Sequence, residues 1–234
     1  MPRDVRTKAI VLRRTDYAEA DRILQLLTPE GKRSVIARGV RKEKSRLAGG
    51  IELFSVSEVI IHQGRGELGI LTGARLLEHY DALVRDLELI EQGGAMMRAA
   101  NARAEHVDSP DFFEILQQSL RAMQKHAGDA SETRWKDILR AWWGLNMVCA
   151  SGEDVNLRFD TDGNKLDAAA RYYWDEESAA LHKADAGRLA ADHIKLLRIM
   201  QAMPVEAALK VRGADALIDE VAYVVKCAER ATSI

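Results

Sequence analysis

Five apolar stretches between Thr7 and Ala74 decide the fold of this chain: TKAIVLRR (7–14), RILQLLT (22–28), RSVIARG (33–39), LFSVSEVIIHQ (53–63) and LGILTGA (68–74). All five are short and rich in Val, Ile and Leu, which favours strands over helices. The sequence PEGK (29–32) between the second and third stretches is typical of a hairpin turn, because Pro presets φ and Gly supplies flexibility. We therefore predict five β-strands in the first part of the chain.

A dense group of cations lies in and after the third stretch. Seven basic side chains stand here against one acid, Glu43: Lys32, Arg33, Arg38, Arg41, Lys42, Lys44 and Arg46. Residues 1–80 hold 15 basic and 10 acidic side chains and residues 81–234 hold 19 and 26, so the formal net charge of −2 hides two parts of opposite sign. Such a cluster is a candidate phosphate-binding surface, although many charge runs are only solvated faces. Most of these cations fall in the longest gap between strands, residues 38–52.

Beyond Leu76 the apolar residues follow the 3.6-residue period of helices. We expect helices over five ranges: Arg85–Glu105, from Asp108–Asp111 through Met123, about Ser131–Val148, Asp185–Met203 and Ala214–Ala231. In the second helix Ser109 can cap the N-terminus and Pro110 suits the first helical position. The irregular residues 150–178 between the third and fourth helices contain the turn sequence DTDGN (160–164), where we expect a small inserted hairpin.

The chain contains no motif that nominates an active site. GRGELG (64–69) matches the pattern GxGxxG, but the residues after it favour a strand, whereas a dinucleotide site needs a helix there. We interpret it as a hairpin turn in which Arg65 is available to a phosphate backbone. The sequence DTDGN resembles the start of a calcium loop, but Lys165 and Arg171 occupy positions six and twelve. The six histidines are scattered, so we expect neither an enzyme nor a resident cofactor.

The spacing of the cysteines and the length of the apolar runs indicate the cellular compartment of the protein. Cys149 and Cys227 lie 78 positions apart, which fits neither a disulfide framework nor a CxxC metal pair. No apolar run of 18 residues occurs, and the sequence MPRDVRTKAIVLRR has charges where a signal peptide needs an apolar core. We therefore expect a cytoplasmic protein without membrane contact.

Several segments resemble the RecO family of bacterial recombination mediators. The resemblance rests on TKAIVLRRTDYAEADRILQLLTPEGK (7–32), ARGVRKEKSRLAGGIELFS (37–55) and GRGELGILTGARLLEHY (64–80). RYYWDEESAALH (171–182) and HIKLLR (193–198) are similar to late segments of the family. The resemblance implies an α+β protein: a five-stranded oligonucleotide/oligosaccharide-binding (OB) barrel followed by an α-helical domain. We accordingly expect domains at 1–80 and 81–234, with the insertion at about 150–178.

The same resemblance implies a function in DNA repair and recombination. Family members bind single- and double-stranded DNA, anneal complementary strands and act with RecR to place RecA on DNA coated by single-strand-binding protein. Such a protein would be nucleoid-associated, and its helical domain is expected to hold the tail of single-strand-binding protein. Many members also carry a four-cysteine zinc site, but the equivalent residues here retain only Cys149. We therefore expect a degenerate zinc-finger region and no bound metal.

We expect ten cations to form the DNA-binding surface: Arg13, Arg14, Lys32, Arg33, Arg38, Arg41, Lys42, Lys44, Arg46 and Arg65. The aromatic residues of this part are Tyr17, Phe54 and Tyr80, so binding should depend more on charge than on stacking. Two other functions remain open. One is a protein–protein adaptor that binds the tail through an apolar pocket near Lys195 and Arg198, and the other is an RNA-binding OB protein of translation.

Overall fold

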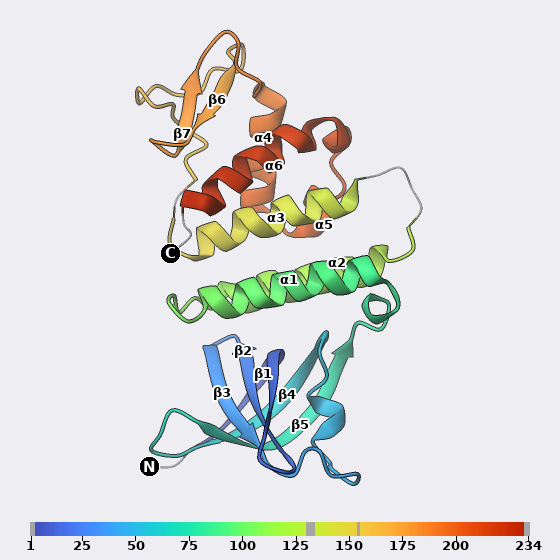
Figure 1. Ribbon diagram of the computed structural model, residues 1–234. Coiled ribbons are helices and arrows are strands. Elements are labelled where there is room, and N and C mark those ends of the chain that lie inside the picture. The colour runs from blue at the N-terminus through green and yellow to red at the C-terminus, as the bar shows by residue number, and fades with distance from the viewer. Residues whose placement is uncertain (1–2, 130–133, 154, 232–234) are drawn as a thin grey trace. The chain divides into compact units, whose positions relative to one another are not determined.

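The computed structural model describes residues 3–129, 134–153 and 155–231. The chain divides into two compact units, Met1–Ala127 and Gly128–Ile234, and each is described by itself. The first unit begins with five strands (Figure 1): β1 (Arg3–Tyr17), β2 (Asp21–Thr28), β3 (Gly31–Ala37), β4 (Ser55–Gln63) and β5 (Gly69–His79). Two short 3₁₀ turns, η1 (Ala48–Gly50) and η2 (Leu83–Arg85), and two helices, α1 (Leu87–Arg103) and α2 (Asp111–His126), complete the unit.

The five strands close into a barrel with the order β1-β2-β3-β5-β4. Strands β3 and β5 pair in parallel, and the other neighbours are antiparallel. Strand β1 closes the barrel: its first part, Arg3–Ile10, pairs with β4, and its second part, Ile10–Tyr17, pairs with β2. A register shift between Val11 and Arg13 bends the strand between these two partners. The α+β class with an N-terminal five-stranded OB fold, expected from the sequence, is confirmed.

The barrel core consists of apolar side chains from the inner face of every strand. Its buried members are Ala9, Val11, Leu24, Leu26, Val35, Ala37, Val40, Ile51, Val59, Ile61 and Leu71. Two of them, Val40 and Ile51, lie in the long segment between β3 and β4, so this segment is anchored to the barrel at both ends. Because a fully buried aliphatic side chain contributes about 1.5–3 kcal/mol, these residues outweigh the strain of the turns.

Helices α1 and α2 pack against β1 within the first unit, and α2 also contacts β2 (Figure 1). The first helix is two residues shorter at each end than expected, because Asp86 caps it by accepting from the amides of Glu88 and Leu89 at 2.9 and 3.2 Å. The expected cap by Ser109 is wrong: Pro110 is the N-cap of α2, and no side chain caps this helix. The domain boundary near residue 80 stays a prediction, and the first compact unit continues beyond it.

The second unit contains α3 (Trp135–Ala150), α4 (Ala191–Ala202), α5 (Val205–Ala208) and α6 (Ala214–Ala231), with the two-stranded sheet of β6 (Tyr172–Asp175) and β7 (Ala180–Lys183). Helix α6 has the bounds predicted from the sequence. The expected start of α3 at Ser131 lies outside the described residues. Helix α4 begins at Ala191 rather than at Asp185, because the amide of Leu189 donates to Tyr172 O at 2.9 Å and so keeps this segment extended beside β6.

The irregular insertion contains the expected turn at residues 160–164. Asp160 is buried, and its carboxylate accepts from the amides of Asp162 and Asn164 at 3.0 and 2.8 Å, as in an ordinary tight turn. The regular hairpin, β6–β7, lies further along the chain and ends at Lys183, beyond the expected limit of residue 178. None of the helices in the described residues combines the length and apolar composition that a membrane crossing needs.

Candidate nucleic-acid interface

The outer face of β1, β2 and β3 is defined by the strand register. Leu24 and Val35 pair with each other and are fully buried, so their row points into the barrel. Successive side chains of a strand point to opposite faces. The neighbouring row, Arg13–Gln25–Ser34, therefore points outward, and here Ser34 Oγ donates to Gln25 Oε1 at 2.8 Å. Arg13 is exposed on this face, and its contact with DNA stays a prediction.

The basic loop, residues 38–47, follows β3 and is tied to the β1–β2 turn. The amide of Gly39 donates to Asp21 Oδ1 at 2.7 Å, and the amide of Arg41 donates to Ala20 O at 3.0 Å. Inside the loop the amides of Lys42 and Ser45 donate to Gly39 O and Lys42 O. These bonds place the basic loop and the β1–β2 turn at the same end of the barrel.

Most cations of the basic loop present a free charge to solvent. Arg38, Lys42, Lys44 and Arg46 are exposed, and within residues 3–129, 134–153 and 155–231 no ion pair or side-chain hydrogen bond involves them. Arg41 is also exposed and lies 3.6 Å from Asp16 Oδ2. Unpaired cations attract phosphate without first giving up an internal partner, so the four unpaired side chains are the best suited to a polyanion.

Asp16 contacts two arginines at this end of the barrel. Its Oδ1 accepts from Arg22 Nε at 2.9 Å, and Arg41 approaches its other oxygen. The hydrogen bond from Arg22, with the nearby charges of Arg41, Arg22 and Arg14, holds the pKa of Asp16 below its ordinary value. The carboxylate therefore stays ionised and holds two guanidinium groups near the β1–β2 turn.

Besides Arg41, two of the ten expected residues have internal partners. Lys32 donates to Asn101 O at 3.1 Å and pairs with Glu105, and its side chain is only 9% exposed. Arg14 donates to Glu52 at 3.0 Å, and its side chain is 27% exposed. Both cations are partly neutralised within the first unit, and Lys32 ties β3 to the C-terminal end of α1.

Arg33 and Arg65 extend the cationic surface at a second place. The parallel pairs Val35–Gly69 and Ile36–Ile70 bring the start of β5 beside β3. Arg33, earlier in β3, and Arg65, in the β4–β5 turn, are both exposed. The GxGxxG sequence is a hairpin turn followed by β5, so the prediction of a turn is confirmed and no helix N-terminus exists there to bind a pyrophosphate.

The structure adds two arginines that sequence reasoning missed. A cleft of about 1170 Å³ in the first unit is lined by Arg13, Arg14 and Asp16, and by Arg22 of β2 and Arg98 of α1. Apolar side chains, among them Leu53, Ile90 and Met97, form the rest of its wall. Arg22 could have been found from its place beside the turn opposite Asp16. Arg98 gave no signal, because nothing in the sequence indicates which helical residue faces the barrel.

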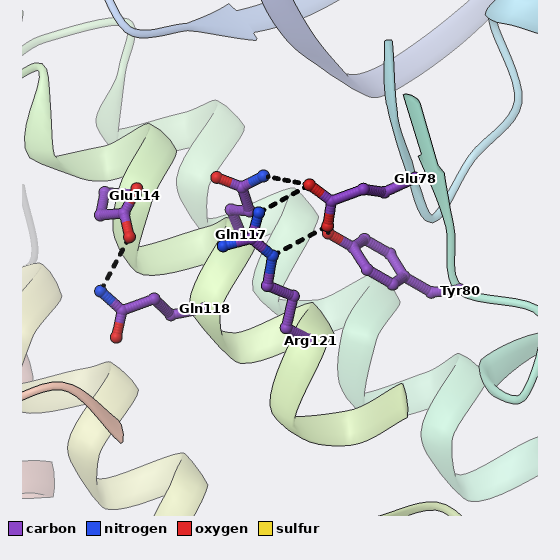
Figure 2. Close-up of polar contacts among 6 residues, drawn as sticks. All are labelled: Glu78, Tyr80, Glu114, Gln117, Gln118 and Arg121. Carbon is purple, nitrogen blue, oxygen red and sulfur yellow. Dashed lines mark hydrogen bonds and ion pairs between the residues drawn. The ribbon is translucent and has the colours of Figure 1, made fainter. Parts of the chain in front are cut away.

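The strongest titratable cluster of the first unit joins β5 to α2 (Figure 2). Glu78 accepts from Arg121 Nε and Nη2 at 2.8 and 2.6 Å, from Gln117 at 3.0 Å and from the Tyr80 hydroxyl at 2.9 Å. The bonds from Arg121 hold the pKa of Glu78 below its ordinary value, and burial raises the pKa of Tyr80. Because each group is paired with another, we interpret the cluster as a structural link and not as acid–base machinery.

The described residues contain no group of three or more His, Cys, Asp or Glu side chains that could hold a metal ion. Cys149 is half-buried near the end of α3 and accepts from Gln201 Nε2 at 3.6 Å. Gln201 also donates to Val155 O at 3.2 Å, and Arg198 donates twice to Leu157 O, at 3.0 and 2.6 Å. Side chains of α4 thus hold the backbone of Val155 and Leu157 in the inserted segment.

Comparison with known proteins identifies the family. Residues 1–80 match the family model described as "Recombination protein O N terminal". The DNA repair protein RecO of Roseiflexus sp. (strain RS-1) is 37% identical over 218 residues, which cover 88% of this chain and 73% of that protein. The DNA repair protein RecO of Dehalococcoides mccartyi (strain CBDB1) is 32% identical over 183 residues, which cover 77% and 69%. The chain therefore belongs to the RecO family of DNA repair and recombination proteins.

Proposed function

We propose that the first unit binds single- and double-stranded DNA through the sugar–phosphate backbone. The proposal rests chiefly on the exposed, unpaired cations of the basic loop, which lie at the end of an OB barrel where oligonucleotides commonly bind. Eight of the ten expected residues are exposed and supply the surface: Arg13, Arg33, Arg38, Arg41, Lys42, Lys44, Arg46 and Arg65. Arg14 and Lys32 would contribute only if their ion pairs opened.

Phosphate contacts carry no sequence information, so affinity should be independent of sequence. If about six phosphates of a single strand are contacted, log K should fall with log salt at a slope near −4. Raising salt from 50 to 200 mM would then weaken binding by roughly 2.5 orders of magnitude. A weak salt dependence would contradict a backbone interface.

Within this proposal the protein is a non-enzymatic recombination mediator. Cations that neutralise two strands at once lower the electrostatic barrier to their approach, which accelerates annealing without nucleotide hydrolysis. Together with RecR, the protein would help to load RecA onto DNA coated by single-strand-binding protein, and it would associate with the nucleoid. Membership of the RecO family supports these finer steps.

The adaptor function is the second candidate, and α4 offers it little support. Leu196 and Leu197, the apolar residues between Lys195 and Arg198, are buried in the second unit. Arg198 is bonded to Leu157 O, and Lys195 pairs with Asp192 at 2.9 Å. A pull-down with a tail peptide, with and without DNA, separates the two functions.

The test is an anisotropy titration of a labelled single strand of mixed sequence at several salt concentrations, followed by addition of the complementary strand. Reversing Arg41, Lys42 and Lys44 to Glu should abolish binding and annealing, while circular dichroism shows that the fold is kept. The matched control reverses Lys210, Arg212 and Lys226, three exposed cations of the second unit. Wild-type affinity in the loop variant would reject the basic loop as the interface. Preference for RNA over DNA of equal length would favour a role in translation.

A further inference from the structure

Tyr17 is the solvent-accessible aromatic residue of the barrel. Residues 3–80 contain three Phe or Tyr side chains, and Phe54 and Tyr80 are 6% and 3% exposed, whereas Tyr17 is 52% exposed. The first two belong to the packed interior. The large apolar ring of Tyr17 therefore lies on the surface and adds nothing to the core.

Tyr17 lies between the basic loop and the outer face of the strands. It is the last residue of β1 and pairs with Asp21, and Asp21 accepts from Gly39 of the basic loop. The register puts Tyr17 on the same face as Arg13, because the two lie four positions apart, an even number, after the bulge. The next residue, Ala18, has a φ of +49° and turns the chain away from the strand direction.

The flanking charges make this a built surface for a nucleic acid rather than for an apolar partner. Asp16 holds Arg22 and Arg41 on one side of the turn, and Arg38 begins the basic loop that is bonded to Ala20 and Asp21. An exposed aromatic ring at the same end of the barrel as unpaired cations is suited to binding single strands, because every base has a π-face and every nucleotide a phosphate.

We propose that Tyr17 stacks on an unpaired base and makes the barrel prefer single-stranded over double-stranded DNA. The inference rests on the proposed function, to which it adds the form of DNA that is recognised. In a duplex both faces of a base are covered by its neighbours, so the duplex gains only the phosphate contacts. Loss of one stacked base lowers affinity about five-fold to a hundred-fold. From the sequence we expect charge to contribute more to binding than stacking. In this proposal charge supplies affinity for single- and double-stranded DNA alike, and stacking on Tyr17 supplies the preference for single strands.

The experiment measures Kd by anisotropy for three probes of equal length: a mixed-sequence single strand, the corresponding duplex and an abasic single strand. Tyr17→Ala should weaken binding of the normal single strand at least five-fold and leave the other two probes and the salt slope unchanged. Leu68→Ala, which truncates an exposed apolar residue of the β4–β5 turn, is the matched control and should change none of the three. Tyr17 is half exposed, so its truncation should leave the thermal midpoint unchanged.

A second readout follows the ring itself. The four native tryptophans all lie in the second unit, so Tyr17→Trp introduces the one indole of the barrel. Its fluorescence, after subtraction of the wild-type signal, should be quenched by the normal single strand and not by the abasic strand. Equal losses for all three probes in Tyr17→Ala, or no loss, would overturn the stacking proposal while DNA binding stands. Absence of wild-type binding to any probe at low salt would overturn both.

Discussion

Replacing Glu78 by alanine tests whether the link between β5 and α2 has the energy that its geometry implies. The carboxylate is the acceptor for the Tyr80 hydroxyl, which is buried with its ring, and losing it should cost about 1–3 kcal/mol. The ion pair with Arg121 is half exposed and screened by solvent, so it adds only about 0.5–1 kcal/mol. We expect Glu78→Ala to lower the free energy of unfolding of the first unit by about 2–3 kcal/mol.

The same geometry predicts a change of sign in a double-mutant cycle. Tyr80→Phe alone removes a hydrogen bond and should destabilise the unit by about 1 kcal/mol. In the Glu78→Ala background it removes a hydroxyl that has lost its acceptor, so it should stabilise by about 1 kcal/mol. Destabilisation of equal size in both backgrounds would refute the dependence of the hydroxyl on Glu78.

Amide hydrogen exchange at increasing urea concentrations is the assay, because peptides from β5 and α2 report on the first unit alone. The tryptophans lie in the second unit, so their fluorescence provides an internal reference. Glu114→Ala is the matched control: this carboxylate is exposed, and its bond to Gln118 lies on the surface of α2 (Figure 2). Its replacement should change the free energy of unfolding by less than about 0.5 kcal/mol.

Acid should remove the contribution of Glu78. Its pKa in the folded protein is lowered, chiefly by the hydrogen bond from Arg121, below an ordinary value of 4.5. A depressed folded pKa gives stability that is complete above the unfolded pKa and is lost as the pH falls through the folded one. The difference in stability between wild type and Glu78→Gln should therefore be constant above about pH 5.5 and shrink below 4.5. A difference that does not shrink as the pH falls below 4.5 would contradict this assignment.

Three further predictions concern the barrel. Lys32→Met should destabilise the first unit by about 1–2 kcal/mol and change the Kd for single strands less than about two-fold. Lys42→Met should instead reduce the slope of log K against log salt by about 0.7, without loss of stability. Ala18→Gly should raise the free energy of unfolding by about 1 kcal/mol, measured from the thermal midpoint, because φ is +49°. Asp16→Asn should release Arg22 and Arg41 and tighten single-strand binding at low salt several-fold; unchanged affinity would show that these arginines do not contact DNA.

The strands of the barrel and helix α6 could be predicted because their signals are local. Runs of Val, Ile and Leu with turn residues between them specify strands wherever they lie, and α6 has an apolar stripe of helical period from Ala214 to Ala228. The start of α4 could not be predicted, because a turn at residues 185–186 and a pairing between Leu189 and Tyr172 replace the first turns of the expected helix. Tertiary pairing here outweighs local propensity.

The candidate interface shows the same limit. Density of charge was enough to select the basic loop as a candidate, and its cations are exposed, while their contact with DNA stays a prediction. Lys32 is chemically the same as Lys42, yet one is paired and nearly buried while the other is free. The difference arises from Glu105, 73 positions away along the chain, which only folding brings to Lys32. Sequence composition can thus locate a cationic surface but cannot say which of its members are already neutralised.

The double pairing of β1 also has a consequence for the order of folding. Residues 10–17 find β2 within a local hairpin, but residues 3–10 must wait for β4, some fifty positions later, before their backbone groups are paired. Until then this half of the strand is an open edge, the kind of surface that recruits other chains. Arg6 and Lys8 alternate along it and remain exposed after closure. Charges at these positions disfavour intermolecular pairing, so they protect the nascent chain during the interval before the barrel closes.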